Sequence, residues 1–230
     1  MMAAKKRFYK SVLLADDGLS IQLDGRNLRS PAGSLLRLPT MSLASVIADE
    51  WRAQGDDIDP ATLPLFGLAV TVVDRVIPQR DAIIAELSAY GGNDLLCYRD
   101  DQDDLASRQQ DQWQPLLDDL AENRGITLQI VTGIMPICQP DAAKFPPLIS
   151  VYDDWRLGML HRATTLSGSL VLGLGFVDMV IDDERMFTLA FLDELWQNEK
   201  WGIDFEAADR QEFLRTELQD VARFLALLGD

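Results

Sequence analysis

Leu166-Ser-Gly-Ser-Leu-Val-Leu-Gly-Leu-Gly-Phe-Val177 is an unusually apolar run, and it is followed by a second apolar segment, Phe187-Thr-Leu-Ala-Phe-Leu-Asp-Glu-Leu-Trp-Gln197. Both runs have the residue content of helices that pack into a core. The first run is too short to span a membrane and is followed at once by Asp178, so it predicts a buried core helix. The C-terminal part of the chain is therefore expected to be helical.

The second run contains an acid in an unusual position. Phe187, Phe191, Glu194 and Leu195 are spaced i, i+4, i+7 and i+8, so a continuous helix would place Glu194 on the same face as two phenylalanines. A carboxylate on an apolar face costs free energy unless another group pairs with it. Glu194 is therefore interpreted either as a satisfied core acid or as a contact for a partner.

The N-terminal part has a different period. Between residues 8 and 38 apolar residues alternate with polar ones, and Asp24-Gly25 is a hairpin-turn signal. The period changes after Pro39, where Thr40 or Ser42 could cap a first helix. Further helices are predicted at about 148–160, 164–181, 183–199 and 205–228.

These patterns predict an α+β fold in which a small N-terminal antiparallel β domain precedes a larger α-helical bundle. The predicted domains are residues 1–55 and 56–230. Residues 126–131 alternate like a strand, and this strand could join the N-terminal domain.

The charge balance limits the choice of partner. The chain has 21 basic and 37 acidic residues, a net charge of −16. Nucleic acid is not expected as a main partner, because phosphate binding needs the opposite sign. Anionic membrane surfaces are disfavoured for the same reason. A basic protein client fits this charge, and so does simple solubility.

Catalytic or cofactor motifs are sparse. His161 is the only histidine, so a multi-histidine metal site or a Ser-His-Asp triad has little material. Gly173-Leu-Gly175 lacks the third glycine of a dinucleotide fingerprint and is interpreted as helix packing. No catalytic residue, cofactor or metal is predicted. One alternative stays open, a carboxylate-based hydrolase that uses Glu194 with Asp193 or Asp178 in the helical domain.

Two tryptophan-containing groups are candidates for binding a partner. Glu50, Trp51 and Gln54 form the first group, while Trp196, Gln197 and Trp201 form the second group beside Glu194. Tryptophan is common both in cores and at the centres of protein interfaces, so both interpretations stay open.

A series of different short motifs follows in order along nearly the whole chain. They are Lys6-Arg-Phe-Tyr-Lys10, Leu23-Asp-Gly-Arg26 with Ser30-Pro31, Leu38-Pro39-Thr40, Glu50-Trp51 with Gln54, Pro64-Leu65, Asp74-Arg75, Tyr90 with Asp94–Arg99, Gln112-Trp113 with Pro115-Leu116, Gly133-Ile134 with Pro136, and Leu192-Asp193-Glu194 with Gln197 and Trp201-Gly202. The series resembles the assembly chaperones for the alpha subunit of F-type ATP synthase, the Atp-twelve type. Ser30 stands where threonine is expected, and the segment from Gly173 to Phe176 has more glycine than the alanine-rich helix of that pattern.

The resemblance implies a β-rich N-terminal domain, a helical C-terminal domain and a non-enzymatic role. Such a protein would keep free alpha subunit soluble until the beta subunit replaces the chaperone. The family's acidic position falls on Glu194. Together with the two tryptophan-containing groups, this gives the expected partner-binding residues: Glu194, Gln197, Trp196, Trp201, Glu50, Trp51 and Gln54.

The resemblance also implies a place in the cell. Family members occur in mitochondria and in alphaproteobacteria, and the N-terminal residues do not resemble a transit peptide. A monomer is expected in the bacterial cytoplasm, or in the mitochondrial matrix if the source is eukaryotic. Neither nucleic-acid binding nor membrane insertion is expected.

Overall fold

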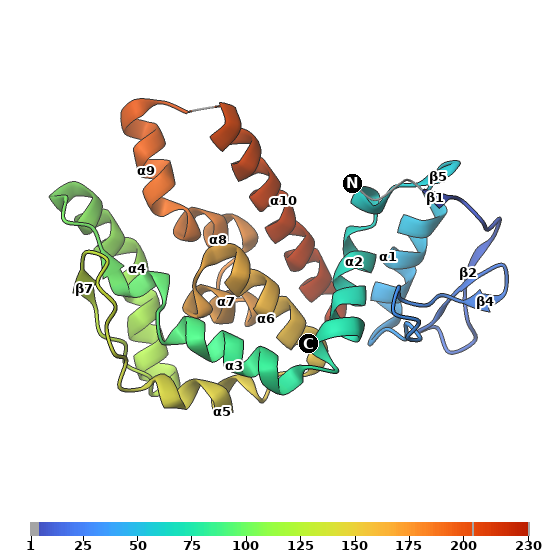
Figure 1. Cartoon of the computed structure of the whole chain (residues 1–230), viewed down its shortest axis with the longest axis horizontal. Coiled ribbons are helices and arrows are strands. Elements are labelled where there is room, and N and C mark those ends of the chain that lie inside the picture. The colour runs from blue at the N-terminus through green and yellow to red at the C-terminus, as the bar shows by residue number, and fades with distance from the viewer. Residues whose placement is uncertain (1–4, 204, 230) are drawn as a thin grey trace. The chain divides into compact units, whose positions relative to one another are not determined.

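The structure is a computed structural model of the chain and describes residues 5–203 and 205–229 (Figure 1). Short strands occur mainly in the N-terminal part, and long helices follow. The strands are β1 (Lys5–Lys6), β2 (Val12–Leu14), β3 (Ile21–Leu23), β4 (Arg26–Asn27), β5 (Asp57–Ile58), β6 (Tyr98–Arg99) and β7 (Val131–Thr132). The α-helices are α1 (Met41–Arg52), α2 (Pro64–Thr71), α3 (Arg80–Gly91), α4 (Asp103–Arg124), α5 (Phe145–Ile149), α6 (Asp154–Ser167), α7 (Leu170–Val177), α8 (Asp183–Ala190), α9 (Leu192–Trp201) and α10 (Phe205–Leu228). Short connecting turns of helix are η1 (Pro60–Thr62), the π-helical η2 (Val72–Val76), η3 (Leu95–Cys97) and η4 (Ala142–Lys144).

The chain divides into two compact units. The first comprises Met1–Arg80 with Arg223–Asp230, and the second comprises Asp81–Ala222. The first unit contains the antiparallel sheet and the second is helical, which confirms the predicted α+β class. The predicted domain limits, 1–55 and 56–230, stay a prediction.

The sheet of the first unit follows the sequence pattern closely. Its strand order is β2-β3-β4, and all pairs are antiparallel. Asp24 and Gly25 both have positive φ, 49° and 75°, as a two-residue hairpin turn requires. The predicted meander is confirmed over these strands. Two isolated bridges extend this pairing, Ser20 with Arg37 and Arg29 with Leu35. A separate two-stranded sheet of the same unit pairs β1 antiparallel with β5.

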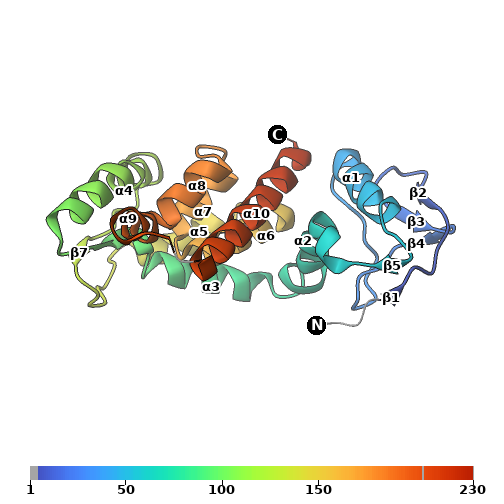
Figure 2. The ribbon, with the colours of Figure 1, turned by 90° about the horizontal axis from the view of Figure 1, so that it is seen from above.

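Helix α1 closes one side of this unit. Thr40 is its N-cap, since its side-chain oxygen accepts a hydrogen bond from the N–H of Leu43 at 3.1 Å. Leu43 and Ile47 are fully buried, and the helix contacts β2. Figures 1 and 2 both show α1 alongside the small sheet. Of the two predicted capping residues, Thr40 is therefore confirmed and Ser42 lies within the helix.

The predicted helix at 164–181 is wrong. Helix α6 ends at Ser167, because Gly168 adopts a left-handed conformation with φ 74°. Ser169 then caps α7 by accepting the N–H of Leu172. The apolar run that opens this segment is therefore divided by Gly168 and Ser169, which are common helix-ending and helix-starting residues.

The predicted helix at 183–199 is also wrong, and the predicted helix at 148–160 has the wrong limits. Phe191 has φ −111° and separates α8 from α9, so the segment forms two helices. Residues 148–160 contain the end of α5 and the first part of α6. The prediction at 205–228 is confirmed by α10.

The predicted strand at 126–131 does not join the N-terminal sheet. Only Val131 and Thr132 form a strand, and β7 pairs in parallel with β6 of the same unit. Side chains occupy the backbone groups that a longer strand would use. Gln139 accepts a hydrogen bond from the N–H of Gln129 at 2.8 Å and donates one to its carbonyl at 3.0 Å.

Helices α6 and α7 pack closely in the core of the second unit. A Cβ atom placed on Gly173 would lie 2.5 Å from the hydroxyl oxygen of Thr164, so only glycine fits there without movement. This confirms the packing interpretation of this glycine. Among the described residues, the structure contains no helix long and apolar enough to cross a bilayer.

Candidate functional site

One face of α9 presents both charge and an aromatic ring to solvent. Glu194, Gln197 and Trp201 are spaced i, i+3 and i+7, so they lie along one side of the helix. The side chain of Glu194 is 40% exposed, Gln197 is exposed, and Trp201 is 71% exposed. These three residues form an accessible stripe, called here the α9 stripe.

The helix break at Phe191 changes the interpretation of Glu194. Phe187 and Phe191 are buried and their ring centroids are 5.0 Å apart. The turn between α8 and α9 removes the single helical face that the spacing predicted, and Glu194 remains partly exposed. Glu194 is therefore not a core acid. Its role as a partner contact stays a prediction.

The carboxylate of Glu194 has one charged neighbour. Arg210 on α10 lies with its guanidinium nitrogen 3.7 Å from a carboxylate oxygen, and both side chains are well exposed. Exposed ion pairs of this kind contribute little free energy. A basic group from another molecule could therefore compete with Arg210 at small cost.

The two tryptophans of α9 have different surroundings. Trp196 is only 3% exposed, and Trp201 packs edge-on against it with ring centroids 5.6 Å apart. The buried ring of Trp196 therefore packs against the exposed ring of Trp201 on its protein-facing side. Beyond the end of α9, Ile203 is 65% exposed, and Phe213 on α10 is 58% exposed. Exposed apolar area of this kind is common at interaction surfaces.

Polar contacts attach α9 to α4. Arg108 makes two hydrogen bonds to Glu199, at 2.8 and 2.9 Å, and Lys200 lies 2.8 Å from Asp104. A hollow of about 240 Å³ lies between these helices and α8, with Leu192 and Leu195 in its lining. These contacts fix the position of the α9 stripe on the second unit.

Asp193 also serves this attachment. It accepts a hydrogen bond from Gln109 at 2.8 Å, and burial raises the pKa of its carboxyl above the ordinary value. Asp193 and Glu194 are neighbours in sequence, yet one binds α4 and the other faces solvent.

Glu50, Trp51 and Gln54 lie at the C-terminal end of α1 and just beyond it, and are called here the α1 group. The acid of this group stabilises the fold. Glu50 is only 9% exposed, and its two carboxylate oxygens accept the N–H groups of Leu65 and Phe66, each at 3.0 Å. These N–H groups belong to the first turn of α2, where a carboxylate satisfies donors that have no helical partner. Glu50 therefore caps α2.

Gln54 and Trp51 are also buried in the first unit. Gln54 donates to the carbonyl of Glu50 at 3.1 Å and to the hydroxyl of Thr62 at 2.8 Å, and it accepts the N–H of Asp59 at 2.8 Å. Trp51 is 6% exposed and packs against the aromatic rings of the same unit.

The seven predicted partner-binding residues fall into two groups. Glu50, Trp51 and Gln54 belong to the first unit, whereas the four residues of α9 belong to the second. The buried residues of the α1 group stabilise the first unit through their hydrogen bonds and packing. The sequence around Glu50 contains no signal that predicts its hydrogen bonds to residues 65 and 66. Partner binding by either group stays a prediction.

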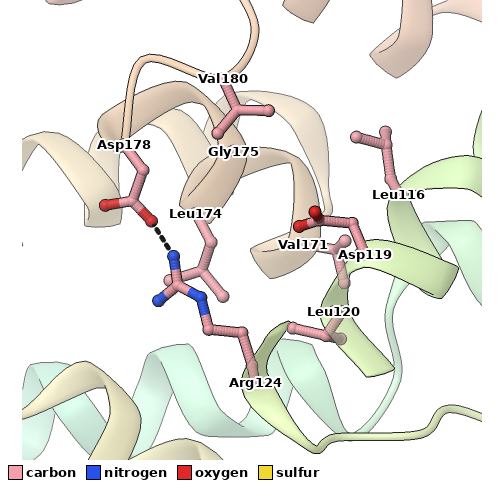
Figure 3. A pocket seen from close by; sticks show the side chains of 9 residues that line it. All are labelled: Leu116, Asp119, Leu120, Arg124, Val171, Leu174, Gly175, Asp178 and Val180. Atoms are coloured by element: carbon pink, nitrogen blue, oxygen red, sulfur yellow. Dashed lines mark hydrogen bonds and ion pairs between the residues drawn. The ribbon is translucent and has the colours of Figure 1, made fainter. Parts of the chain in front are cut away.

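Asp178 and Asp193, two of the three acids of the alternative hydrolase, form hydrogen bonds or ion pairs with neighbouring side chains. Asp178 accepts hydrogen bonds from Tyr152 at 2.9 Å and forms an ion pair with Arg124, which Figure 3 shows beside a hollow of about 30 Å³. Burial, with the nearby Asp178 charge, raises the pKa of Tyr152 to about 12. Among the described residues, no group of three or more possible metal ligands occurs.

Comparisons with known proteins agree with one another. Residues 6–121 match the family model described as ATP12 chaperone protein. A similar curated protein is "Protein atp12, mitochondrial" of Schizosaccharomyces pombe, which is 24% identical over 214 residues, 86% of this chain and 74% of that protein.

Solved structures give stronger likeness. The crystal structure of Atp12 from Paracoccus denitrificans is 38% identical with a TM-score of 0.90, covering 97% of this chain and 98% of that chain. A single-residue variant of the same bacterial protein gives the same values. A protein of Agrobacterium tumefaciens is 34% identical with a TM-score of 0.88, covering 97% of this chain and 86% of that chain.

Proposed function

The chain belongs to the ATP12 chaperone family, and from that premise we propose that it binds the unassembled alpha subunit of F-type ATP synthase during assembly of the enzyme. Binding keeps the alpha subunit from aggregating until the beta subunit takes its place. The family assignment supports a chaperone of ATP synthase assembly.

The observation that carries the proposal is the α9 stripe. An unassembled subunit exposes the surface meant for its neighbour, and such surfaces aggregate. Trp201 supplies exposed apolar area, and Glu194 and Gln197 supply polar contacts on the same side of the helix. The second unit has 27 acidic and 10 basic residues, so its field attracts a basic client surface.

Release needs no nucleotide in this proposal. If the beta subunit binds the same client surface more tightly, mass action displaces the chaperone. A non-enzymatic role agrees with the structural contacts of two acids of the second unit. Asp178 pairs with Arg124, and Asp193 accepts a hydrogen bond from Gln109. We infer a monomer that acts in the bacterial cytoplasm, or in the mitochondrial matrix of a eukaryote.

The first test is light scattering of purified alpha subunit after dilution from denaturant. We expect this protein to suppress aggregation at a near-stoichiometric ratio without nucleotide. Subsequent addition of beta subunit should release the chaperone. Absence of suppression, in a sample where a general chaperone works, would refute the choice of client.

Variants of the α9 stripe test the site. Glu194→Gln and Trp201→Ala should each weaken protection of the alpha subunit. The chaperone concentration needed to suppress aggregation should rise by about tenfold, and the thermal unfolding temperature should not change. The matched controls are Glu122→Gln and Val151→Ala, since both residues are exposed in the same unit. Equal protection by all four variants would mean that the client binds elsewhere.

A further inference from the structure

A hollow of about 510 Å³ lies in the first unit, beside the hairpin that joins β3 and β4. Its apolar lining includes the buried side chains of Tyr9, Leu23 and Leu28. Phe8 also lines it and is 59% exposed. The hollow therefore combines a hydrophobic floor with an accessible aromatic ring.

Two arginines also line this hollow. Arg26 and Arg29 are both exposed, and within the described residues the guanidinium of Arg26 makes no hydrogen bond or ion pair. Arg29 donates one hydrogen bond, to the carbonyl of Gly33 at 2.7 Å, and keeps its other donors. Two guanidinium groups are thus available to an anion.

The acid in the lining of the hollow is already engaged. Asp24 accepts the N–H groups of Lys10 and Ser11, at 3.0 and 2.8 Å, and the hydroxyl of Ser11 at 3.0 Å. These hydrogen bonds, the one from the Ser11 N–H first, hold the pKa of Asp24 below its ordinary value. Its oxygens are directed to the chain at Lys10 and Ser11, so the arginines remain open to a ligand.

The charge of the first unit differs from that of the second. The sequence of the first unit has 11 basic and 10 acidic residues, against 10 and 27 in the second. The first unit is therefore +1 and the second −17 by sequence, so an acidic ligand can approach the first unit with little repulsion from that unit's own residues.

The sheet offers a third feature. β4 is the last strand in the order β2-β3-β4, so the outer edge of Arg26–Asn27 has no partner strand in the described part of the chain. Just beyond this short edge, the bridge between Arg29 and Leu35 closes it. An extended peptide can add to such an edge through backbone hydrogen bonds. Every second side chain of that peptide would then face the same side of the sheet.

We propose that this hollow is a second binding surface, for an extended acidic segment of a protein partner. A carboxylate of the segment pairs with Arg26 and Arg29, where planar guanidinium groups favour bidentate contacts. An apolar residue two positions away covers Phe8 and the floor. An inorganic phosphate or a nucleic-acid backbone would leave this apolar lining exposed to water. This surface is distinct from the α9 stripe and does not depend on the alpha subunit as client.

The test uses fluorescence anisotropy with a short labelled peptide in which glutamate and phenylalanine alternate at every second position, with serine between them. We expect saturable binding to the full chain. Arg26→Glu should weaken it by about tenfold, and Phe8→Ala should weaken it several-fold. Arg223→Glu, which changes an exposed arginine of the same unit, should leave affinity unchanged.

Several outcomes would overturn the proposal. One is equal binding of a peptide with glutamine in place of glutamate, and another is an equal loss with Arg223→Glu. Single-stranded DNA or phosphatidylserine vesicles binding through Arg26 in place of the peptide would identify a different ligand. Thermal unfolding of each variant separates lost binding from lost fold. The alpha-subunit aggregation assay stays informative whichever result is obtained.

Discussion

At the scale of single residues, two buried carboxylates hold the first turns of helices that lie far along the chain. Glu50 accepts N–H groups at the start of α2. Asp94 accepts the hydroxyl of Ser169 at 2.7 Å and the N–H of Val171 at 3.1 Å, at the start of α7. Both positions use the partial positive charge of a helix N-terminus. Their effect is therefore on stability.

Replacing Glu50 with alanine should lower the free energy of unfolding by about 2 to 3 kcal/mol, because one buried and one part-buried N–H group lose their charged acceptor. Chemical denaturation followed by circular dichroism measures this change. Glu122→Ala, at an exposed position of α4, is the control and should change stability by less than about 0.5 kcal/mol. A full-stability Glu50→Ala protein that fails to bind its client would instead favour a direct contact.

Asp94 should make stability depend on pH. Burial, outweighing its hydrogen bonds, raises the pKa of Asp94 from 3.8 to about 6. The folded state then holds the proton more tightly than the unfolded state. The resulting contribution is fully present below pH 3.8 and is lost as pH rises to about 6, a loss of roughly 3 kcal/mol.

The Asp94→Asn variant isolates this contribution, since asparagine does not titrate. The stability of the wild type minus that of Asp94→Asn should fall as pH rises from about 4 to about 6 and be level above that. Denaturation curves at a series of pH values measure the difference. A constant difference across this range would show that Asp94 has an ordinary pKa in the folded protein.

At the scale of elements, short breaks set the directions of the helices. Gly168 and Ser169 separate α6 from α7, and Phe191 separates α8 from α9. The first break allows α7 to fold back on α6, where Gly173 faces Thr164 closely. The second break releases Glu194 from the apolar face of Phe187. Each break thus decides which side chains are buried.

The close approach of α6 and α7 predicts opposite effects at two glycines. Gly173→Ala should destabilise the protein by about 1 to 3 kcal/mol, because the new Cβ would lie 2.5 Å from the Thr164 hydroxyl oxygen. Gly175→Ala is the matched control. Its Cβ would lie 3.7 Å from Ile181, an ordinary contact, and alanine favours the helix by up to about 1 kcal/mol. Thermal unfolding compares the two; equal melting temperatures would mean that the helices can separate freely.

At the scale of the whole molecule, charge is distributed unevenly. The second unit carries a net −17 by sequence, and it contains the α9 stripe. Long-range attraction raises association rates more than it slows dissociation. The proposed chaperone function therefore depends on ionic strength.

Raising salt from about 50 to about 500 mM should slow association with the alpha subunit by about tenfold and change dissociation much less. Stopped-flow fluorescence on freshly diluted alpha subunit measures both rates. Glu194→Gln should lower association only slightly at every salt concentration, because it removes one charge among many. An association rate that does not respond to salt would mean that apolar contact alone drives binding.

The local pattern of the sequence by itself determined much of the fold. Alternation and turn residues predicted the antiparallel sheet, the Asp24-Gly25 hairpin and the Thr40 cap. These features depend on residues that are neighbours in sequence, and short-range sterics and hydrogen bonding govern them. The series of motifs also predicted the family, since the order of many short blocks carries more information than any one block.

Only the tertiary structure decided which candidate site residues are buried. Glu50 meets its partners 15 and 16 residues away, and Asp94 meets Ser169 75 residues away. Glu194 is exposed because the chain turns at Phe191, and β7 pairs with β6 across 33 positions, as in Tyr98 with Val131. Periodicity describes one element at a time, whereas burial depends on which distant elements pack against it.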